Sequence, residues 1–357
     1  MHRVLAINPG STSTKFAVYF GNECVLRKTI RHPLEQLLRF KTIIDQFDLR
    51  KGLIIEVLQE EGIEVDSIKY IIGRGGLTYP LESGVYRVNN RMIEHLREGI
   101  LGQHASNLGP ILADYIALQI PGAKAFMADP VVTDELDEVA RYAGHPKFQR
   151  ISIFHALNQK ATARLHAQKM NKKYESLNLI VAHLGGGISV GAHKNGRVID
   201  VNNALDGEGS FSPERSGTLP VGQVIDLCFS GKYGKEQIRR MVVGEGGFVA
   251  YLGTNNAQEV EKRVKQGDEK ASAVQQALFY QVAKMVGEMA TVLEGKVDGI
   301  LLTGGLAFNK DLEKYIQQKC GFIAAIYTYP GEDELEALAL NALRVAQGEI
   351  EAKEYNK

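Results

Sequence analysis

Two glycine-rich hairpins, separated by almost half of the chain, constrain the fold more than any other feature of the sequence. The first begins with an apolar strand at 4–7, followed by a loop of glycine and hydroxyl residues and an apolar strand at 16–20. The second repeats this order from residue 180 onward. With one offset of 175 residues, three pairs of positions match: Asn8 with His183, Gly10 with Gly185, and Gly21 with Gly196. The repetition predicts two duplicated domains, and a chance likeness between two glycine-rich hairpins is the alternative.

The residues of the first loop are suited to binding phosphate. Gly10 allows close approach of the backbone, the hydroxyl groups of Ser11 and Ser13 can donate hydrogen bonds, and Lys15 can neutralise negative charge. An ordinary polar hairpin tip is the alternative for a short motif taken alone. Because the design occurs twice, we expect each domain to present one such hairpin to a shared cleft, where the active site would lie.

Composition excludes several classes of partner. With 357 residues, the chain is long enough for two cores. Lysine plus arginine and aspartate plus glutamate both number 42, which gives no electrostatic reason to expect a nucleic acid or an acidic membrane as partner. Three widely spaced cysteines predict a reducing compartment. No apolar run approaches the length of about 18 residues that a membrane span needs, so we expect a cytoplasmic protein.

Apolar periodicity and turn residues predict an α/β chain. We expect a first domain over 1–150, a second over 151–334, and a C-terminal segment, 335–357, that returns to the first. The predicted strands of the first domain, besides the hairpin, are 24–30, 68–72 and 123–128, and its predicted helices are 33–61, 89–98 and 111–119. The second domain is predicted to have strands at 197–201, 298–303 and 323–327 and helices at 156–170, 221–229, 235–243, 259–266, 269–293 and 309–318, with a last helix at 335–347.

Two charged residues follow predicted strands of the first domain. Arg74 lies among glycines after strand 68–72, and Asp129 follows strand 123–128. The strand ends of open α/β sheets are where ligands bind, so both are candidate site residues. The alternatives are a solvated surface arginine for Arg74 and a turn or cap for Asp129.

The second domain offers a cation and a glycine turn. Arg215 lies in an irregular loop, 206–220, whose length favours a functional role. Gly304 and Gly305 join a strand to a helix, where a nucleotide can approach the backbone closely and the helix dipole favours its charge.

These features together indicate phosphoryl transfer from a nucleoside triphosphate, without a P-loop or a protein-kinase signature. The duplicated hairpins are typical of the actin-like ATPase superfamily. Members that act on a hydroxyl group or on water commonly carry an acidic residue where this chain has Asn8. An alcohol benefits from such a base, whereas a carboxylate is already ionised at pH 7. A carboxylate substrate needs cations instead, and Arg74 and Arg215 could supply them.

The segments 4–15 and 180–192 resemble the two signatures of the acetokinase family, and the resemblance covers essentially the whole chain. The Asn-Pro-Gly start, the Gly-Arg-Gly-Gly segment at 73–76 and His104-Ala-Ser-Asn107 are more similar to the butyrate kinase branch than to the acetate kinase branch. The resemblance implies two actin-like, ribonuclease H-like domains. It also implies the reaction of ATP and a short-chain carboxylate to give ADP and an acyl phosphate, with Mg²⁺, and at least a dimer.

The resemblance also implies roles for individual residues. Arg74 and Arg215 would bind the carboxylate and stabilise the transition state, and Asp129 would orient the metal. Glu332 or Glu334 would match the acidic residue near the metal. The residues implied at the nucleotide and its phosphates are Asn8, Ser11, Ser13, Lys15, His183, Gly185, Gly186, Gly187, Gly304, Gly305 and Asn309, and those implied in the substrate pocket are Arg74, His104, Gln159 and Arg215.

Two positions depart from the acetate kinase pattern. Gln159 stands where acetate kinase has a histidine that contacts phosphate, and Gly186 stands where it has asparagine. Both departures are expected of a butyrate-type enzyme that takes butyrate or a related short or branched-chain acid. An acetate or propionate kinase, a sugar or polyol kinase with Asp129 as base, and a non-enzymatic actin-like assembly or nucleotide-switch protein are the other interpretations.

Overall fold

The computed structural model describes residues 2–357 and divides the chain into two compact units. The first unit comprises Met1–Thr133 and Asp333–Lys357, and the second comprises Asp134–Glu332. The first boundary thus falls at Thr133 rather than at 150. The segment after it belongs to the second unit because the Asp137 amide donates to the Ile199 carbonyl and Arg150 pairs with Asp200 at 3.0 Å.

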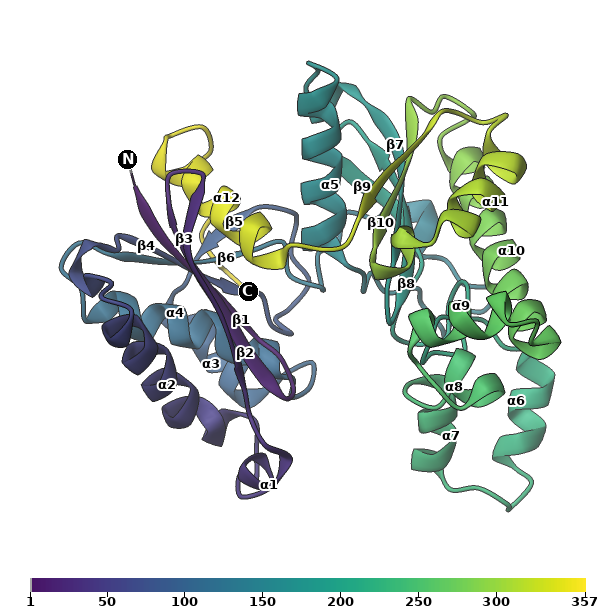
Figure 1. Cartoon of the computed structure of the whole chain (residues 1–357), viewed down its shortest axis with the longest axis horizontal. Coiled ribbons are helices and arrows are strands. Elements are labelled where there is room, and N and C mark those ends of the chain that lie inside the picture. Colours follow the sequence, from purple (N-terminus) through teal and green to yellow (C-terminus); the bar gives the residue numbers. More distant parts are fainter. Residues whose placement is uncertain (1) are drawn as a thin grey trace. The chain divides into compact units, whose positions relative to one another are not determined.

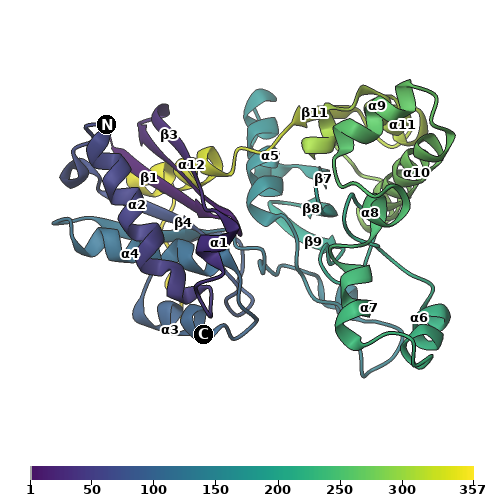
Figure 2. The ribbon, with the colours of Figure 1, turned by 60° about the horizontal axis from the view of Figure 1, so that its bottom comes forward.

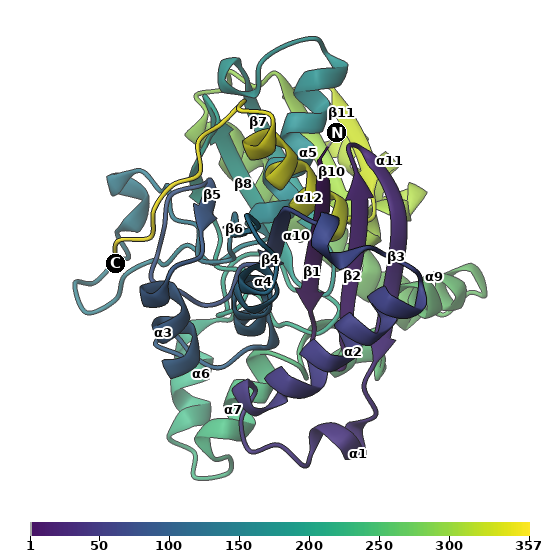
Figure 3. The ribbon, with the colours of Figure 1, turned by 90° about the vertical axis from the view of Figure 1, so that its left-hand side faces the viewer.

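The first unit is built on a six-stranded sheet with the order β3-β2-β1-β4-β6-β5. Strands β1, β2 and β3 are antiparallel neighbours, whereas β1, β4 and β6 are parallel. Figure 3 shows the first three strands side by side, with α2 across them. The strands are β1 (Arg3–Pro9), β2 (Ser13–Phe20), β3 (Glu23–Arg31), β4 (Tyr70–Arg74), β5 (Val85–Arg87) and β6 (Lys124–Ala128).

Helices cover both faces of this sheet (Figure 1). The helices α2 and α4 lie on one face, where residues such as Ile54 and Leu112 pack against Leu5 and Ile7. The last helix, α12, lies on the other face beside β1 and β4. Beyond it, Tyr355 is buried and its hydroxyl group lies 2.7 Å from His95 Nδ1. The helices are α1 (Leu34–Leu37), α2 (Phe47–Glu60), α3 (Asn90–Glu98), α4 (Leu108–Leu118) and α12 (Glu334–Ala346).

The helix expected over 33–61 is interrupted after α1. Leu38, which fits the helical periodicity, is exposed. The Thr42 amide donates to Asp45 Oδ2 and the Asp45 amide donates to Thr42 Oγ1. These local side-chain bonds compete with helical ones, and a new helix begins only at Phe47.

The second unit has a five-stranded sheet with the order β11-β10-β7-β8-β9. The helix α5 lies on one face, and α10 and α11 lie on the other (Figure 2). Its strands are β7 (Asn178–Leu184), β8 (Ile188–Lys194), β9 (Arg197–Val201), β10 (Gly299–Gly304) and β11 (Ile326–Pro330). Its helices are α5 (Ala156–Lys169), α6 (Val221–Cys228), α7 (Lys235–Val242), α8 (Gly247–Leu252), α9 (Ala257–Lys265), α10 (Glu269–Val292) and α11 (Lys310–Cys320). The strand expected at 323–327 begins three residues later, and the sequence did not predict α8 or β5.

The two sheets share one topology, as expected of duplicated domains. In each sheet, three consecutive strands form an antiparallel meander. The first strand of the meander, β1 or β7, also pairs with a parallel strand, β4 or β10, and a second parallel strand follows. The turn glycines Gly21 and Gly196 both have a positive φ, of 57° and 82°. Ile7 and Ala182 are equivalent at the offset of 175 residues. Gly73 pairs with Ile7 and Leu302 pairs with Ala182, so Gly73 and Leu302 are also equivalent. The pair Gly75-Gly76 therefore corresponds to Gly304-Gly305.

No helix within residues 2–357 is both long enough and apolar enough to cross a membrane.

Candidate active site

The end of β1 carries the first candidate site residue. Asn8 is buried, and its Nδ2 atom donates to Glu334 Oε2 at 2.5 Å. The loop that follows exposes Ser11 and Lys15, with Ser13 half-buried. Hydroxyl, amide and ammonium donors thus surround the tip of the first hairpin, which is the chemistry that a phosphate group needs.

Arg74 lies at the end of β4 and shares one partner, Glu334, with Asn8. Its guanidinium pairs with Glu334 Oε1 at 3.0 Å. The backbone around it is closely packed, because a Cβ on Gly73 would lie 2.1 Å from the Gly109 carbonyl carbon and one on Gly76 would lie 2.6 Å from Asn107 Cα. Only glycine fits here, so Arg74 is presented from a rigid strand end.

Asp129 follows β6 directly and is also buried. Its Oδ1 atom accepts from Ser83 Oγ at 2.6 Å and from the Gly84 amide at 2.9 Å. Its φ of 38° is unusual for a residue other than glycine. Such backbone strain persists where the surroundings hold it and clusters at functional sites. The positive φ is consistent with the candidate role of Asp129, and its bonds to Ser83 and Gly84 hold the side chain in place.

His104 has a local structural partner. Its Nδ1 atom lies 2.8 Å from Ser106 Oγ and accepts from the Ser106 amide, so it caps the short turn Ala105–Asn107. Within that turn, Asn107 binds the Leu77 amide and the carbonyls of Leu96 and Gly102. These residues hold the segment after Arg74 in place.

In the second unit, two histidines stack at the end of β7. The rings of His155 and His183 are 3.7 Å apart and nearly parallel, at 11°. His183 Nδ1 lies 2.7 Å from Asn158 Oδ1, which makes Nδ1 the donor. His183 Nε2 lies 3.4 Å from Glu332 Oε2. From the sequence, His155 was as readily a packed or solvated residue as a functional one, and it was not among the candidate site residues.

Gln159 is fully buried behind these histidines. Its Nε2 atom donates to the Ser189 carbonyl and hydroxyl oxygens, and its Oε1 atom lies 2.9 Å from His193 Nε2. Both ends of the amide are thus engaged within the protein. Ser189 links Gln159 to the histidine pair, because its Oγ atom accepts from Gln159 Nε2 and lies 2.9 Å from His155 Nδ1.

The glycine loop 185–187 contacts Arg215 directly. A Cβ on Gly187 would lie 2.0 Å from Arg215 Nη1, so the guanidinium occupies the space that the missing side chain leaves. Arg215 Nη1 donates to the Ala204 carbonyl at 2.7 Å, and Ser212 Oγ donates to the Gly186 carbonyl. Burial lowers the pKa of Arg215, and its buried Nε atom has no hydrogen-bond partner among residues 2–357.

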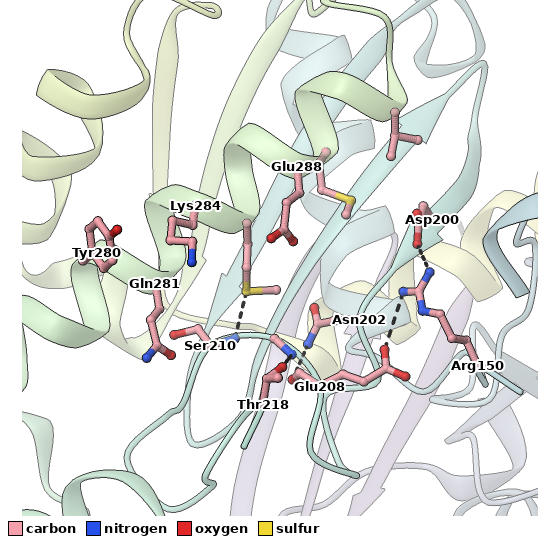
Figure 4. A pocket seen from close by; sticks show the side chains of 14 residues that line it. Arg150, Asp200, Asn202, Glu208, Ser210, Thr218, Tyr280, Gln281, Lys284 and Glu288 are labelled. Carbon is pink, nitrogen blue, oxygen red and sulfur yellow. Dashed lines mark hydrogen bonds and ion pairs between the residues drawn. The ribbon is translucent and has the colours of Figure 1, made fainter. Parts of the chain in front are cut away.

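A pocket of about 720 Å³ lies between the loop 206–220 and α10 (Figure 4). Arg150 pairs with Asp200 at 3.0 Å and with Glu208 at 3.5 Å. The Ser210 amide donates to the sulfur of Met285 on α10. These contacts fix the path of the loop, and therefore the place of Arg215.

The glycine turn after β10 is also closely packed. Gly304 has a φ of 86°, and a Cβ on it would lie 2.5 Å from the Leu184 carbonyl oxygen. A Cβ on Gly305 would meet open space. Asn309 caps α11, because its Oδ1 atom accepts from the amides of Asp311 and Leu312. The turn thus leaves room beside Gly305 at the start of a helix.

The carboxylates expected near a metal are distributed over both units. Among residues 2–357, no three His, Cys, Asp or Glu side chains gather as a metal-binding cluster. Mg²⁺ in phosphoryl-transfer sites commonly takes one or two carboxylates together with phosphate oxygens and water, so a single well-placed carboxylate fits its chemistry. All three expected carboxylates already have protein partners: Glu334 binds Asn8 and Arg74, Asp129 binds Ser83 and the Gly84 amide, and Glu332 lies beside His183.

The chain has the actin-like ATPase fold. The chain is 18% identical to the crystal structure of acetate kinase from Porphyromonas gingivalis, with a TM-score of 0.81, covering 97% of this chain and 100% of that one. For a propionate kinase from Francisella tularensis subsp. tularensis, the identity is also 18%, with a TM-score of 0.75 and coverage of 96% and 99%.

Sequence comparison gives the family. The family model for the acetokinase family matches residues 148–320. Butyrate kinase 2 of Clostridium acetobutylicum is 52% identical over 353 residues, which is 99% of both chains. This chain belongs to the acetokinase family.

Proposed function

We propose that this chain is a butyrate kinase, which transfers the terminal phosphoryl group of ATP to butyrate, or to a related short or branched-chain acid, and releases ADP and the acyl phosphate. The observation that carries the proposal is the identity of 52% to butyrate kinase 2 over the whole chain. The chemistry of the candidate site residues in each unit also supports it.

Asn8 supports a carboxylate as the acceptor. Its amide is fixed as a donor to Glu334 and cannot act as a base. A carboxylate attacks without losing a proton, so direct in-line transfer needs positioning and charge stabilisation rather than base catalysis.

The two arginines would supply the positive charge. Arg74 uses one Nη atom for Glu334, and a guanidinium has five N–H donors in all, so several remain for a substrate carboxylate. Arg215 would face the transferring phosphoryl group, next to the glycine loop and the histidine pair. His155 would donate to a phosphate oxygen there, and His183, whose Nδ1 donates to Asn158, stacks against the His155 ring.

Nucleotide and metal would be held by the loops already described. Ser11, Ser13, Lys15 and the glycines at 185–187 would contact the phosphates, and Gly304, Gly305 and Asn309 would lie by the adenosine. Asp129, with Glu332 as second candidate, would hold Mg²⁺ directly or through water. When bound, the metal neutralises charge on the phosphates. Here Ser83 and the Gly84 amide keep the Asp129 carboxylate oriented.

A hydroxamate trap for acyl phosphate tests the proposal, with ATP, Mg²⁺ and acids from acetate to valerate. We expect the highest kcat/KM with butyrate or a branched acid of similar size. A maximum at acetate or propionate would instead indicate that type of kinase. A parallel assay with sugars and polyols tests the remaining enzyme class, in which Asp129 would be the base. Product with none of these acids would contradict the proposal.

We also propose that the enzyme acts as a homo-oligomer, at least a dimer. The helix α6 supports this, because none of its residues is buried and Val221, Ile225 and Phe229 are 72%, 51% and 87% exposed. Exposed apolar surface of this kind commonly marks an interface. Light scattering on the purified protein measures the mass, and a monomer at micromolar concentration would contradict the proposal.

A further inference from the structure

The helix α2 places a buried guanidinium directly beneath the first hairpin loop. Arg50 is fully buried, although it lies on a helix that is otherwise partly solvated. Within residues 2–357, no carboxylate pairs with it. Its guanidinium is satisfied by the Gln46 side chain on its own helix and by the loop 11–14. A buried cation without an acidic partner is costly to the fold, so its presence calls for a compensating role.

The contacts of Arg50 fix the backbone of the loop. Its Nη1 atom donates to the Ser13 carbonyl at 3.0 Å and to Thr14 Oγ1 at 2.9 Å, and its Nη2 atom donates to the Ser11 carbonyl at 3.3 Å. The remaining carbonyl, of Thr12, accepts from the His32 amide at 2.8 Å. The carbonyls of Ser11, Thr12 and Ser13 are therefore held by protein donors.

The same arrangement leaves donors available on the loop. Within residues 2–357, the amides of Ser11 and Thr12 have no protein acceptor, and both residues are exposed. Successive backbone amides that are free of their neighbours' carbonyls form an anion-binding concavity. A loop with its carbonyls held and its amides available is set up to receive phosphate before any nucleotide arrives.

We propose that Arg50 is a positioning residue for nucleotide phosphate. Its guanidinium holds the carbonyls of the loop 11–14 away from the phosphate and adds a positive charge beneath the loop. This inference rests on the proposed function in so far as that loop binds the nucleotide. Arg50 would touch neither nucleotide nor acid, so its effect would act through the loop, by way of the Ser11 and Thr12 amides.

The test measures the affinity for ADP by calorimetry, without any acid present, for wild-type enzyme, Arg50→Met and Arg50→Lys. We expect Arg50→Met to weaken ADP binding at least tenfold. Arg50→Lys keeps a charge but not the forked donors, and should weaken binding about three- to fivefold. Adenosine, which has no phosphate, should bind all three proteins equally. The matched control Lys51→Met changes the next residue of α2, whose Nζ atom pairs with Asp48, and should leave ADP affinity unchanged.

A purely structural role for Arg50 would give a different pattern. The variants would then melt at a lower temperature, while the folded fraction would bind ADP with wild-type affinity. That result would overturn the inference. If Arg50→Met does not fold, the ADP affinities of Gln46→Leu and Arg50→Lys test the inference instead. Gln46→Leu removes the side chain that orients the guanidinium and leaves the loop residues unchanged. Unchanged ADP affinity in both would equally overturn it.

Steady-state kinetics separate this inference from the proposed function. We expect Arg50→Lys to raise the KM for ATP while the KM for butyrate changes less than twofold. If none of the tested acids gives acyl phosphate with wild-type enzyme, but ADP binding still depends on Arg50, the proposed function fails and the inference stands. If wild-type enzyme is active and ADP binding ignores Arg50, only the inference fails.

Discussion

Glu334 pairs with Arg74 at 3.0 Å, and its other oxygen accepts from Asn8 at 2.5 Å. One carboxylate at the start of α12 thus ties together the ends of β1 and β4. The segment that carries it returns to the first unit from the far end of the chain, 326 residues after Asn8. Glu334 therefore orients the guanidinium that we propose as the carboxylate-binding group.

Arg74→Ala should lower kcat/KM by roughly two to four orders of magnitude, the scale observed when a charge-stabilising group is removed. Glu334→Gln keeps the shape of the side chain but not its charge, and should cost roughly tenfold to a hundredfold because Arg74 loses its fixed orientation. The hydroxamate assay measures both. Near-native turnover of Arg74→Ala would show that this arginine is a bystander.

Gly187→Ala should impair catalysis in the same way as Arg215→Ala. The added methyl group would lie 2.0 Å from Nη1 and 2.6 Å from Cζ of Arg215. The end of this long side chain can move, so we expect the guanidinium to be displaced and kcat to fall by roughly two orders of magnitude or more, with little change in melting temperature. Gly186→Ala, whose methyl group would first meet Glu214 at 3.5 Å, should lose much less. Equal losses in both would contradict this account.

Gly304→Ala should destabilise the second unit by roughly 2 to 4 kcal/mol, because it combines an unfavourable positive φ with a clash against backbone. The clash is with the Leu184 carbonyl, at 2.5 Å. Gly305→Ala is the matched control, since its methyl group would meet open space and should change the free energy of unfolding by less than about 0.5 kcal/mol. Urea denaturation compares the two, and similar stabilities would contradict the prediction.

His32 should make the first unit sensitive to acid. Burial and the charge of Arg50 lower the pKa of His32 from 6.5 to about 4. Between these values the unfolded chain binds a proton that the folded chain does not, so the free energy of unfolding falls as the pH falls through this window. The loss attributable to His32 is up to about 3 kcal/mol.

Urea denaturation at pH 7 and near pH 4.5 tests this dependence. His32→Gln should show a smaller difference between the two pH values than wild-type protein. The control His2→Gln changes an exposed histidine of the same unit and should behave as wild type. An unchanged pH dependence in His32→Gln would rule out His32 as its source.

The sequence predicted the parts of the fold that depend on local patterns. Both hairpins, the long helix α10 and the strand end at Arg74 follow from apolar periodicity and glycine placement, and the structure has them. The break between α1 and α2 was missed, because Thr42 and Asp45 form a local hydrogen-bond pair within an otherwise helical pattern. Local bonding of this kind is not visible in periodicity.

Residue type and local pattern were enough to choose candidate site residues, but they could not show which residues are buried by long-range contacts. The sequence alone singled out Arg74, Arg215 and the glycine loops as candidates. It could not show that Gln159 is enclosed by Ser189 and His193, because nothing in the local pattern separates a buried glutamine from an exposed one. Arg50 was missed for the same reason, since its partners lie 36 to 39 residues away.

Because the two sheets are equivalent, Arg74 of β4 occupies the position in the first unit that Thr303 of β10 occupies in the second. In one copy this strand end carries a long cation, and in the other a buried hydroxyl group whose Oγ1 atom donates to the Gly331 carbonyl. The equivalent strand ends thus present different chemistry, a cation in one unit and a hydroxyl group in the other. A substitution at one strand end can therefore change the chemistry of its own unit and leave the equivalent strand end of the other unit unaltered.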